Sequence, residues 1–526
     1  MAEIYVVGSG PAAISCAHAL VSQGHPVTIL DAGVELEPER QQIVREIRRQ
    51  QPEEWDPKLL NTFKDGAGAT GSGVPIKRVY GSDFPYRYVR DHLRLHTENV
   101  TAFSSFARGG LSNVWGAAVL PYQAQDIDAW PVSRAQLTPY YERVFEFMPL
   151  AAVHDDLEQR FPLHAHTIQA LKPSVQARTI LERSRRHHDS LLRQGFTVGQ
   201  SRLAIAAEHA AEDGRCVYCG LCMYGCPQDV IYNASHTLAH LLRTGRVRYI
   251  PNIVVDTVEE NEAAITIHAH ARTTGQQVEF TGDRIFLGAG VISTAHIMLR
   301  SHGFEGAELR LLDSQYFLLP LLALFGAAGV EREKLHTLAQ VYIELDNPLL
   351  GHRPAHLQVY TYNDLYDSAM RNMLKAAYSI AGAPARLALN RLLVIQGYLH
   401  SDFSSGATLA YRNSMLTLTR TLNPRAGATV RTITRLLRQN RHALGFVPLS
   451  PLLNLGNPGQ GAHIGGTFPM RHTPDRLETD VLGRPASMSR LHIVDGSVLP
   501  SIPATTITLS VMANAYRIGS EALLHG

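Results

Sequence analysis

Residues 4–13, Ile-Tyr-Val-Val-Gly-Ser-Gly-Pro-Ala-Ala, decide the fold of this chain. The first four form a short apolar run typical of a buried parallel strand, and the other six form a G-x-G-x-x-A turn. Residues 14–23 indicate a helix, and residues 27–30 indicate a second strand that leads into Asp31. This order of strand, glycine turn, helix, strand and acidic residue predicts a Rossmann-type α/β unit.

The residues of the turn indicate what this unit binds. Gly8 and Gly10 permit a tight turn in which a pyrophosphate can approach the N-terminus of the following helix. Asp31 lies 23 residues after the first glycine, where its carboxylate can accept hydrogen bonds from a ribose. We therefore predict a dinucleotide site, although the turn alone does not distinguish FAD from NAD.

The composition is that of a soluble globular protein with a large interior. The chain has 526 residues, of which 45% are hydrophobic and 18% charged, and two domains are expected at this length. Its net charge of +2 indicates neither nucleic-acid binding nor general attraction to membranes. Because the first strand begins near Glu3, we find no room for a targeting peptide and expect a cytoplasmic protein.

Residues 216–227 read Cys-Val-Tyr-Cys-Gly-Leu-Cys-Met-Tyr-Gly-Cys-Pro and contain four of the five cysteines. The spacing C-x2-C-x2-C-x3-C-P is that by which bacterial ferredoxins hold an iron–sulfur cluster, and it predicts metal ligation by Cys216, Cys219, Cys222 and Cys226. Disulfides, a four-cysteine zinc site and spare buried thiols are the alternatives. Disulfides would require an exported chain, and structural zinc sites usually have a longer spacer between two cysteine pairs. Cys16 is expected to be an inert core thiol of the nucleotide-binding helix.

The end of the chain carries a family resemblance. Residues 461–470 (GAHIGGTFPM), 491–500 (LHIVDGSVLP) and 503–509 (PATTITL) closely resemble the closing segment of the glucose–methanol–choline (GMC) oxidoreductases, which use FAD. Residues 108–117 (RGGLSNVWGA) resemble the family's glycine-rich loop beside the flavin. Residues 284–294 (RIFLGAGVIST) resemble its second signature. The resemblance covers roughly 1–35, 100–130, 210–300 and 455–526 and implies FAD as the cofactor.

The resemblance also implies roles for individual residues. His463 occupies the position of the family's base, which takes the proton of a substrate hydroxyl as hydride passes to the flavin. Where the family usually has a second His or Asn, this chain has Thr506, which cannot act as a base near pH 7. The residues expected to bind FAD are Gly8, Gly10, Pro11, Ala12, Ala13, Asp31, Gly109, Gly110, Ser112, Asn113, Trp115, Gly116, Val255, Gly288, Ala289, Asp495, Gly496, Thr505 and Thr506.

Within this family the cysteines resemble those of iron–sulfur-containing FAD glucose and sugar-acid dehydrogenase subunits. Cys216, Cys222 and Cys226 match the C-x5-C-x3-C-P spacing that holds a three-iron cluster in those proteins. Cys219 is additional, so that a fourth ligand could complete a [4Fe–4S] cluster, which we favour over [3Fe–4S].

The expected fold class is α/β: a Rossmann-type, GMC/p-hydroxybenzoate-hydroxylase-like FAD-binding domain with an α+β substrate domain on an antiparallel sheet. The first domain is assigned residues 1–130, 200–300 and 455–526, including the iron–sulfur loop 214–228, and the second residues 131–199 and 301–454. Alternation predicts strands at 340–345, 357–362, 393–399 and 406–411. Helices are expected from residue 228 onward, at about 364–391 and at 425–442. The apolar residues 316–330 are expected to be buried, with a lid or a membrane contact as alternatives.

The sequence thus predicts an FAD-dependent dehydrogenase that oxidises a hydroxyl group of a sugar, polyol or lipophilic alcohol. Electrons would leave singly through the cluster to a cytochrome, ferredoxin or quinone, and a small escort subunit is conceivable. One alternative is a reductase or isomerase that acts on a C=C bond. The other is a non-catalytic electron-transfer subunit. Direct use of oxygen is disfavoured, because oxygen would make a cluster unnecessary.

Overall fold

The structure is a computed structural model that describes residues 3–65, 77–207, 215–301, 304, 306–365 and 390–524. Its first sheet contains five parallel strands in the order β20-β9-β1-β2-β5. The strands are β1 (Ile4–Val7), β2 (Val27–Leu30), β5 (Val247–Ile250), β9 (Arg284–Leu287) and β20 (Leu491–Ile493). The predicted Rossmann-type unit is therefore present, and its sheet combines strands from distant parts of the chain.

Helices α1 (Pro11–Ser22) and α15 (Thr508–Glu521) pack closely against each other beside this sheet. Ser15 Oγ donates to Met512 O at 2.7 Å, and Gly519 allows the two backbones to approach closely. Pro11 occupies the first position of α1, where a missing N–H breaks no helical hydrogen bond. Cys16 is fully buried in this contact, as expected of a core thiol.

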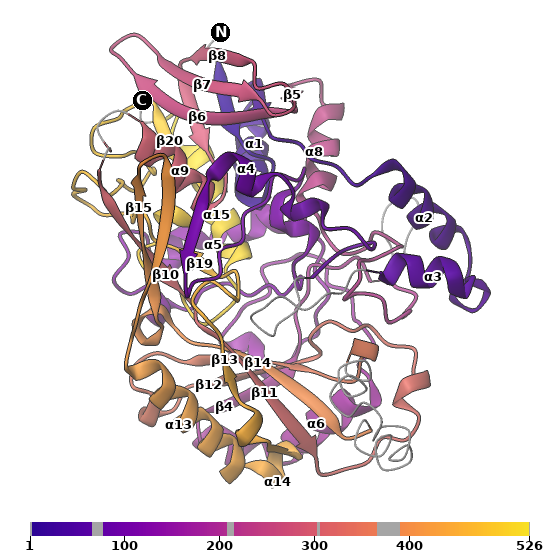
Figure 1. Ribbon diagram of the computed structural model, residues 1–526. Coiled ribbons are helices and arrows are strands. Elements are labelled where there is room, and N and C mark those ends of the chain that lie inside the picture. Colours follow the sequence, from indigo (N-terminus) through magenta and orange to yellow (C-terminus); the bar gives the residue numbers. More distant parts are fainter. Residues whose placement is uncertain are drawn as a thin grey trace.

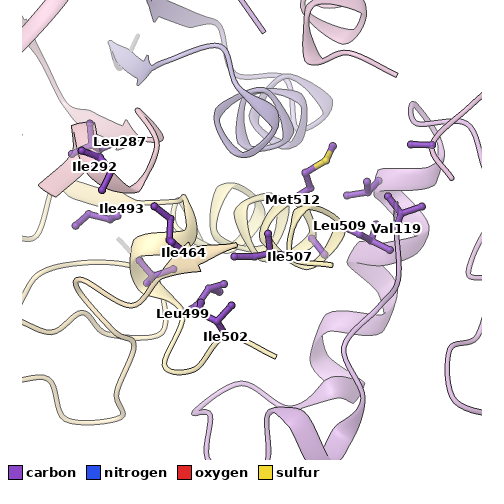
Figure 2. Packing of buried hydrophobic residues seen from close by; sticks show 14 of the residues in the cluster. Val119, Leu287, Ile292, Ile464, Ile493, Leu499, Ile502, Ile507, Leu509 and Met512 are labelled. Carbon is purple, nitrogen blue, oxygen red and sulfur yellow. The ribbon is translucent and has the colours of Figure 1, made fainter. Parts of the chain in front are cut away.

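Apolar side chains fill the space between α15, the segment 464–507 and the sheet (Figure 2). Ile464, Ile493 and Ile507 lie together there, with Leu287 at the end of β9 and Ile292 in α9 (Val291–Arg300). All are buried, so the C-terminal segment forms part of the core that supports the sheet. The buried residues of the segment 464–507 are consequently packed beside the nucleotide-binding unit.

A second sheet has seven antiparallel strands, ordered β17-β11-β14-β13-β12-β4 with β18 beside β11. They are β4 (Phe196–Gln200), β11 (Tyr316–Ala323), β12 (Val341–Leu345), β13 (Ala355–Tyr360), β14 (Leu392–Tyr398), β17 (Phe446–Pro448) and β18 (Asn454–Leu455). One apolar face packs on α6 (Val175–Arg186), α13 (Arg425–Gln439) and α14 (Arg441–Leu444), of which α13 and α14 lie below the sheet in Figure 1. The antiparallel sheet expected over residues 340–399 and the helix at 425–442 are present.

The strand predicted at 406–411 belongs to a different sheet, which is a correction. β15 (Gly406–Arg412) lies between β10 (Glu308–Asp313) and β16 (Met415–Thr421), in a sheet completed by β19 (Ile464–Gly465) and β3 (Leu95–Glu98). β15 pairs Ala407 and Leu409 with buried leucines of β10, which explains this partner. Antiparallel strands β6 (Ile253–Glu260), β7 (Ile265–Ala271) and β8 (Gln277–Gly282) form a further sheet.

Two other expectations are altered by the structure. The helix expected from residue 228 begins only at Ala234, as α8 (Ala234–Arg243), because Asn233 caps it by accepting from Ser235 N. Residues before the cap are extended, and Tyr232 N donates to Ala204 O. The helix expected at 364–391 falls mostly outside the described residues. The further helices are α2 (Pro38–Arg49), α3 (Pro57–Lys64), α4 (Val89–Leu93), α5 (Arg134–Phe145) and α7 (His188–Arg193).

The apolar stretch at 316–330 begins with β11, an interior strand. Phe317, Leu319 and Leu321 are completely buried on the apolar face of the seven-stranded sheet. Their burial agrees with the expectation for the first part of the stretch. Leu322 and Leu324 are 37% and 40% exposed, so the remainder of the stretch is only partly buried, which is a correction. In the part of the chain that the structure describes, no helix has the length and apolar character needed to span a bilayer. The residue boundaries of the two domains stay a prediction.

Candidate active site

Four predicted cofactor residues follow the ends of four neighbouring parallel strands. Gly8 follows β1, Asp31 follows β2, Gly288 follows β9, and Asp495 comes two residues after β20. Gly8 N donates to Leu30 O at 2.8 Å, so the turn is tied to the end of β2. The carboxyl edge of a parallel sheet is where nucleotides bind in this type of fold, so the structure brings these predicted residues to the appropriate place.

The glycine-rich loop at 108–117 lies directly on the first turn. Gly109 N donates to Ser9 Oγ at 2.9 Å. A Cβ atom on Gly110 would lie 3.1 Å from Gly10 Cα, so that this approach depends on the missing side chains. Gly109 and Gly110 both have positive φ angles, which favour glycine. The two predicted phosphate-binding segments therefore form one glycine-lined surface beside the N-terminus of α1.

Ser112 and Asn113, also predicted to bind the cofactor, make contacts within the protein. Ser112 Oγ accepts from Ala234 N at 3.0 Å, and Asn113 Oδ1 accepts from Asn233 Nδ2 at 2.8 Å. These bonds join the glycine-rich loop to the beginning of α8. The two side chains thus position the loop, a role that the sequence did not indicate. Val255, in β6, is buried and forms part of the main apolar core.

Asp31 is buried and already hydrogen-bonded within the protein. Its Oδ2 accepts from Ser9 Oγ at 2.6 Å and from Tyr249 Oη at 2.8 Å. Burial raises the pKa of Asp31 to about 6, although both hydroxyl groups act to lower it. The contact with a ribose stays a prediction, and the structure adds that Asp31 also fixes the turn through Ser9.

We expect Asp31→Asn to stabilise the chain without bound nucleotide at pH 8, by at most about 3 kcal/mol. A carboxyl whose pKa rises from 3.8 to about 6 on folding binds more protons when folded, so its contribution to stability falls as pH rises through this range. The neutral amide lacks this penalty and still accepts hydrogen bonds. Urea unfolding of both proteins checks this: the difference between their free energies of unfolding should increase from about pH 4 to pH 6. The same difference in free energy at pH 4 and at pH 6 would contradict the prediction.

Asp495 joins the C-terminal segment to the beginning of α9. Its Oδ2 accepts from Gly290 N at 2.8 Å and from Thr294 Oγ1 at 2.6 Å, and its Oδ1 accepts from Ser497 N at 2.9 Å. Burial raises the pKa of this carboxyl, and the hydrogen bonds act in the opposite direction. The structure therefore gives Asp495 an anchoring role, while its predicted contact with the flavin, and that of Gly496 and Ala289, stays a prediction.

His463 lies between the C-terminal core and the seven-stranded sheet. Its carbonyl oxygen accepts from Ser314 N at 2.9 Å, and its ring stacks on Tyr398 with centroids 4.6 Å apart and planes 22° apart. Nδ1 is buried and has no hydrogen-bond partner among the described residues. Burial, and secondarily the nearby His356, lower the pKa of His463 to about 3. The imidazole is consequently neutral at pH 7.

Thr505 and Thr506 are both buried between the core and residues 117–122. Thr506 Oγ1 accepts from Leu120 N at 3.1 Å, which leaves its own proton available for donation. Thr505 Oγ1 has no partner within the part of the chain that the structure describes. Neither residue can act as a base in place of the second histidine that the family usually has at this position. Their contacts with a substrate or flavin stay predictions.

A buried Glu344–His356 pair was missed by the sequence analysis. Glu344 Oε1 and His356 Nδ1 form a hydrogen-bonded pair on the face of the seven-stranded sheet opposite the helices. The available signal was the alternation of β12 and β13, which places Glu344 and His356 away from the apolar face. The sequence could not show that this second face is also covered.

All four cysteines of the 216–227 segment line a single small cavity, together with His336. All five cysteines are free, which excludes the disulfide alternative in this structure. Burial raises the pKa of Cys216, Cys219 and Cys226, and repulsion from Cys222 adds to the effect. Among described residues, no three His, Cys, Asp or Glu side chains converge to hold a metal ion. Soft thiols around one cavity match the donors of an iron–sulfur cluster, but cluster binding is not established.

Lys77 links the cysteine cavity to the glycine-rich loop. Its Nζ donates to Trp115 O at 3.0 Å. Burial lowers the pKa of Lys77 to about 8, whereas the nearby Cys222 and Cys226 act to raise it. Trp115 Nε1 in turn donates to Tyr232 O, close after the cysteine segment. The cysteines are thus adjacent to the loop that carries the predicted flavin residues Trp115 and Gly116.

Comparisons with known proteins agree with this architecture. Residues 368–515 match the sequence profile of the GMC oxidoreductases. A search of curated protein sequences finds no match. The crystal structure of pyridoxine 4-oxidase from Mesorbium loti is similar over 100% of both chains, with a TM-score of 0.59 and 15% identity, which is evidence for the fold alone. The expected fold class is confirmed: the chain has the GMC oxidoreductase fold, and residues 368–515 match the model of the C-terminal domain of that family.

Proposed function

We propose that the chain is an FAD-dependent oxidoreductase that oxidises a hydroxyl group of a small molecule, with His463 as the proton acceptor. The observation that carries this proposal is the neutral imidazole of His463, whose buried Nδ1 has no partner among the described residues. A neutral imidazole can accept the hydroxyl proton as the C–H bond is broken. Because the pKa of His463 is low, its protonated ring is a strong acid and must release the accepted proton promptly.

The residues present fit FAD. The N-terminus of α1 offers the unbonded amide groups of its first turn to a pyrophosphate, and Gly8, Gly10 and Gly110 keep side chains out of its way. Asp31 at the end of β2 suits a ribose. Bound FAD would supply the hydride acceptor. The protein would contribute orientation of the substrate, exclusion of water and removal of the hydroxyl proton.

We further propose that Cys216, Cys219, Cys222 and Cys226 bind an iron–sulfur cluster, [4Fe–4S] rather than [3Fe–4S]. Support comes from the four thiols around one cavity and from the buried cation of Lys77, which would offset the charge of thiolate ligands. A cluster would supply one-electron transfer to a cytochrome, ferredoxin or quinone. The contact from Lys77 to Trp115 supports this proposal, because it places the cavity beside the predicted flavin loop.

Cys222→Ser is expected to remove the cluster and leave the flavin bound. The substitution takes away one ligand, and Cys16→Ser is the matched control, because Cys16 lies in α1 away from the cavity. Iron and sulfide per flavin are counted in anaerobically purified protein, with EPR spectra before and after dithionite. About four irons with a reduced-state signal support [4Fe–4S], and about three with an oxidised-state signal support [3Fe–4S]. If the unmodified protein contains flavin but no iron, the proposal that these cysteines bind a cluster is wrong.

Oxygen as the electron acceptor is the second candidate function. What supports it is the name of the structurally similar protein, which is an oxidase. Alcohol-dependent formation of hydrogen peroxide by iron-free protein would establish it. Turnover with one-electron dyes but not with oxygen would favour the relay. Absence of flavin in the purified protein would reject both candidates.

A further inference from the structure

The two faces of β12 and β13 differ sharply in polarity. The apolar face presents Val341, Ile343 and Leu345 from β12 to the helices beneath the sheet. The opposite face presents Glu344 and, from β13, the polar series His356, Gln358 and Tyr360, all buried. Burying polar groups opposes folding unless their hydrogen bonds are satisfied. A buried polar face in a sheet therefore calls for a functional explanation.

The polar groups form a continuous chain of hydrogen bonds. Glu344 binds His356 Nδ1, His356 Nε2 lies 3.1 Å from Gln358 Nε2, and Tyr360 Oη donates to Gln358 Oε1 at 3.3 Å. A carboxylate only accepts, so Nδ1 of His356 carries a proton and the orientation of its ring is fixed. Glu344 and His356 are 0% exposed, so the hydrogen bond between them is stronger than it would be in water.

Stacked aromatic rings connect this hydrogen-bond network to His463. Glu344, His356 and Tyr398 are directly paired across β12, β13 and β14. The rings of His356 and Tyr398 are 6.4 Å apart at 25°, and those of Tyr398 and His463 are 4.6 Å apart at 22°. Tyr398 is thus held between two imidazole rings, one of which is anchored by a carboxylate.

We propose that Glu344 and His356 are positioning residues that hold His463, through Tyr398, in the orientation needed to accept a substrate proton. This inference rests on the proposed role of His463. The pair is not expected to touch the substrate. It forms a fixed support behind Tyr398, on the side of His463 that faces the seven-stranded sheet.

The other titratable groups near His463 do not provide an equivalent support for its ring. Asp313 approaches from β10, where it pairs with Ile464, and its buried carboxyl lies close to the backbone N–H of Gly459, which acts to lower its pKa. Burial raises the pKa of Asp313 to about 8, so the group is largely uncharged at pH 7. Tyr316 packs on Tyr398 from β11 and, like Tyr360, has its pKa raised by burial. His356 is the only imidazole that these contacts place beside Tyr398 from the sheet.

The test is hydrogen–deuterium exchange at C2 of each histidine, measured by mass spectrometry on the intact chain from about pH 5 to pH 9. Exchange proceeds through the protonated ring, so at pH 7 the rate rises about tenfold for each unit by which the pKa of His463 rises. His356→Gln removes the support behind Tyr398 and admits water to His463, which weakens the desolvation that lowers this pKa. We therefore expect His463 to exchange at least about tenfold faster in this variant.

Matched variants separate positioning from general loosening. Tyr398→Leu removes the stacking ring and should accelerate exchange at His463, whereas Tyr398→Phe keeps the ring and should not. His352→Gln, which removes an exposed imidazole just before β13, should leave the rate unchanged. His492, buried against Phe286 in the parallel sheet, is the internal reference for global opening.

The inference is overturned if His463 exchanges at the unmodified rate in folded His356→Gln, or equally fast in His352→Gln. If His356→Gln does not fold, the comparison of Tyr398→Leu with Tyr398→Phe decides, and equal rates reject the proposal. Neither flavin nor substrate is needed for this measurement. If the protein shows the expected exchange but binds no flavin, the proposed function is rejected and the positioning role of Glu344 and His356 is retained.

Discussion

His463→Asn is expected to lower the rate of flavin reduction by hydroxyl substrates by a factor of about 10²–10⁴. Asparagine keeps a similar size and can donate a hydrogen bond, but it cannot accept a proton near pH 7. The flavin should stay bound, because His463 lies outside the glycine-lined turn and loop. Anaerobic stopped-flow reduction, with a panel of sugars, polyols and apolar alcohols, measures the effect directly.

The control for this experiment is His352→Asn, which alters an exposed imidazole away from the site and should react at the unmodified rate. Partial recovery of the slow variant at high pH is expected, because hydroxide ions then compete for the substrate proton. Reduction of His463→Asn at the unmodified rate at every pH would show that another group accepts the proton.

Gly8→Ala is expected to cost about 2–6 kcal/mol of folding stability and to remove the flavin. The residue has φ +100°, and a Cβ there would lie 2.6 Å from the carbonyl oxygen of Gly288. Neither atom can move without disturbing β1 or β9, which are adjacent in the sheet. Because proteins of this kind are stable by only about 5–15 kcal/mol, the loss is severe. Thermal unfolding and flavin content measure it.

Gly245→Ala is the matched control for backbone strain. Gly245 has φ +71°, but no atom lies within 4 Å of the position that a Cβ would take, so the substitution introduces strain without a clash. We expect it to cost about 1 kcal/mol and to leave the flavin bound. Equal losses in the two variants would show that the close approach of Gly8 to Gly288 is unimportant.

The nucleotide-binding unit was predictable because its requirements are local. Four apolar residues, glycines at fixed offsets and an acidic residue after the second strand specify a turn that few other structures need. Alternation also located β12, β13 and β15, since a period of two is a property of each strand alone. It could not assign β15 to its sheet, because the partner β10 lies about 100 residues earlier in the chain.

The active site was predictable only in part. His463 was found through a resemblance, whereas its lowered pKa depends on burial by residues that a sequence does not place. The Glu344–His356 pair escaped notice because polar residues on alternate strand positions usually face water. Ser112, Asn113 and Asp495 were predicted to bind the cofactor, and this stays a prediction. The structure adds that they fix the N-terminal ends of α8 and α9, which the sequence did not indicate.

The packing of α1 against α15 has a consequence for biosynthesis. β1 and α1 are synthesised some 490 residues before β20 and α15, which complete their sheet and cover them. At about 5–20 residues per second, the wait lasts roughly 25–100 s. Throughout this interval the apolar side of α1 lacks its partner in the nascent chain. The early segment is therefore a natural client for chaperones, and the nucleotide site can close only after α15 has been synthesised.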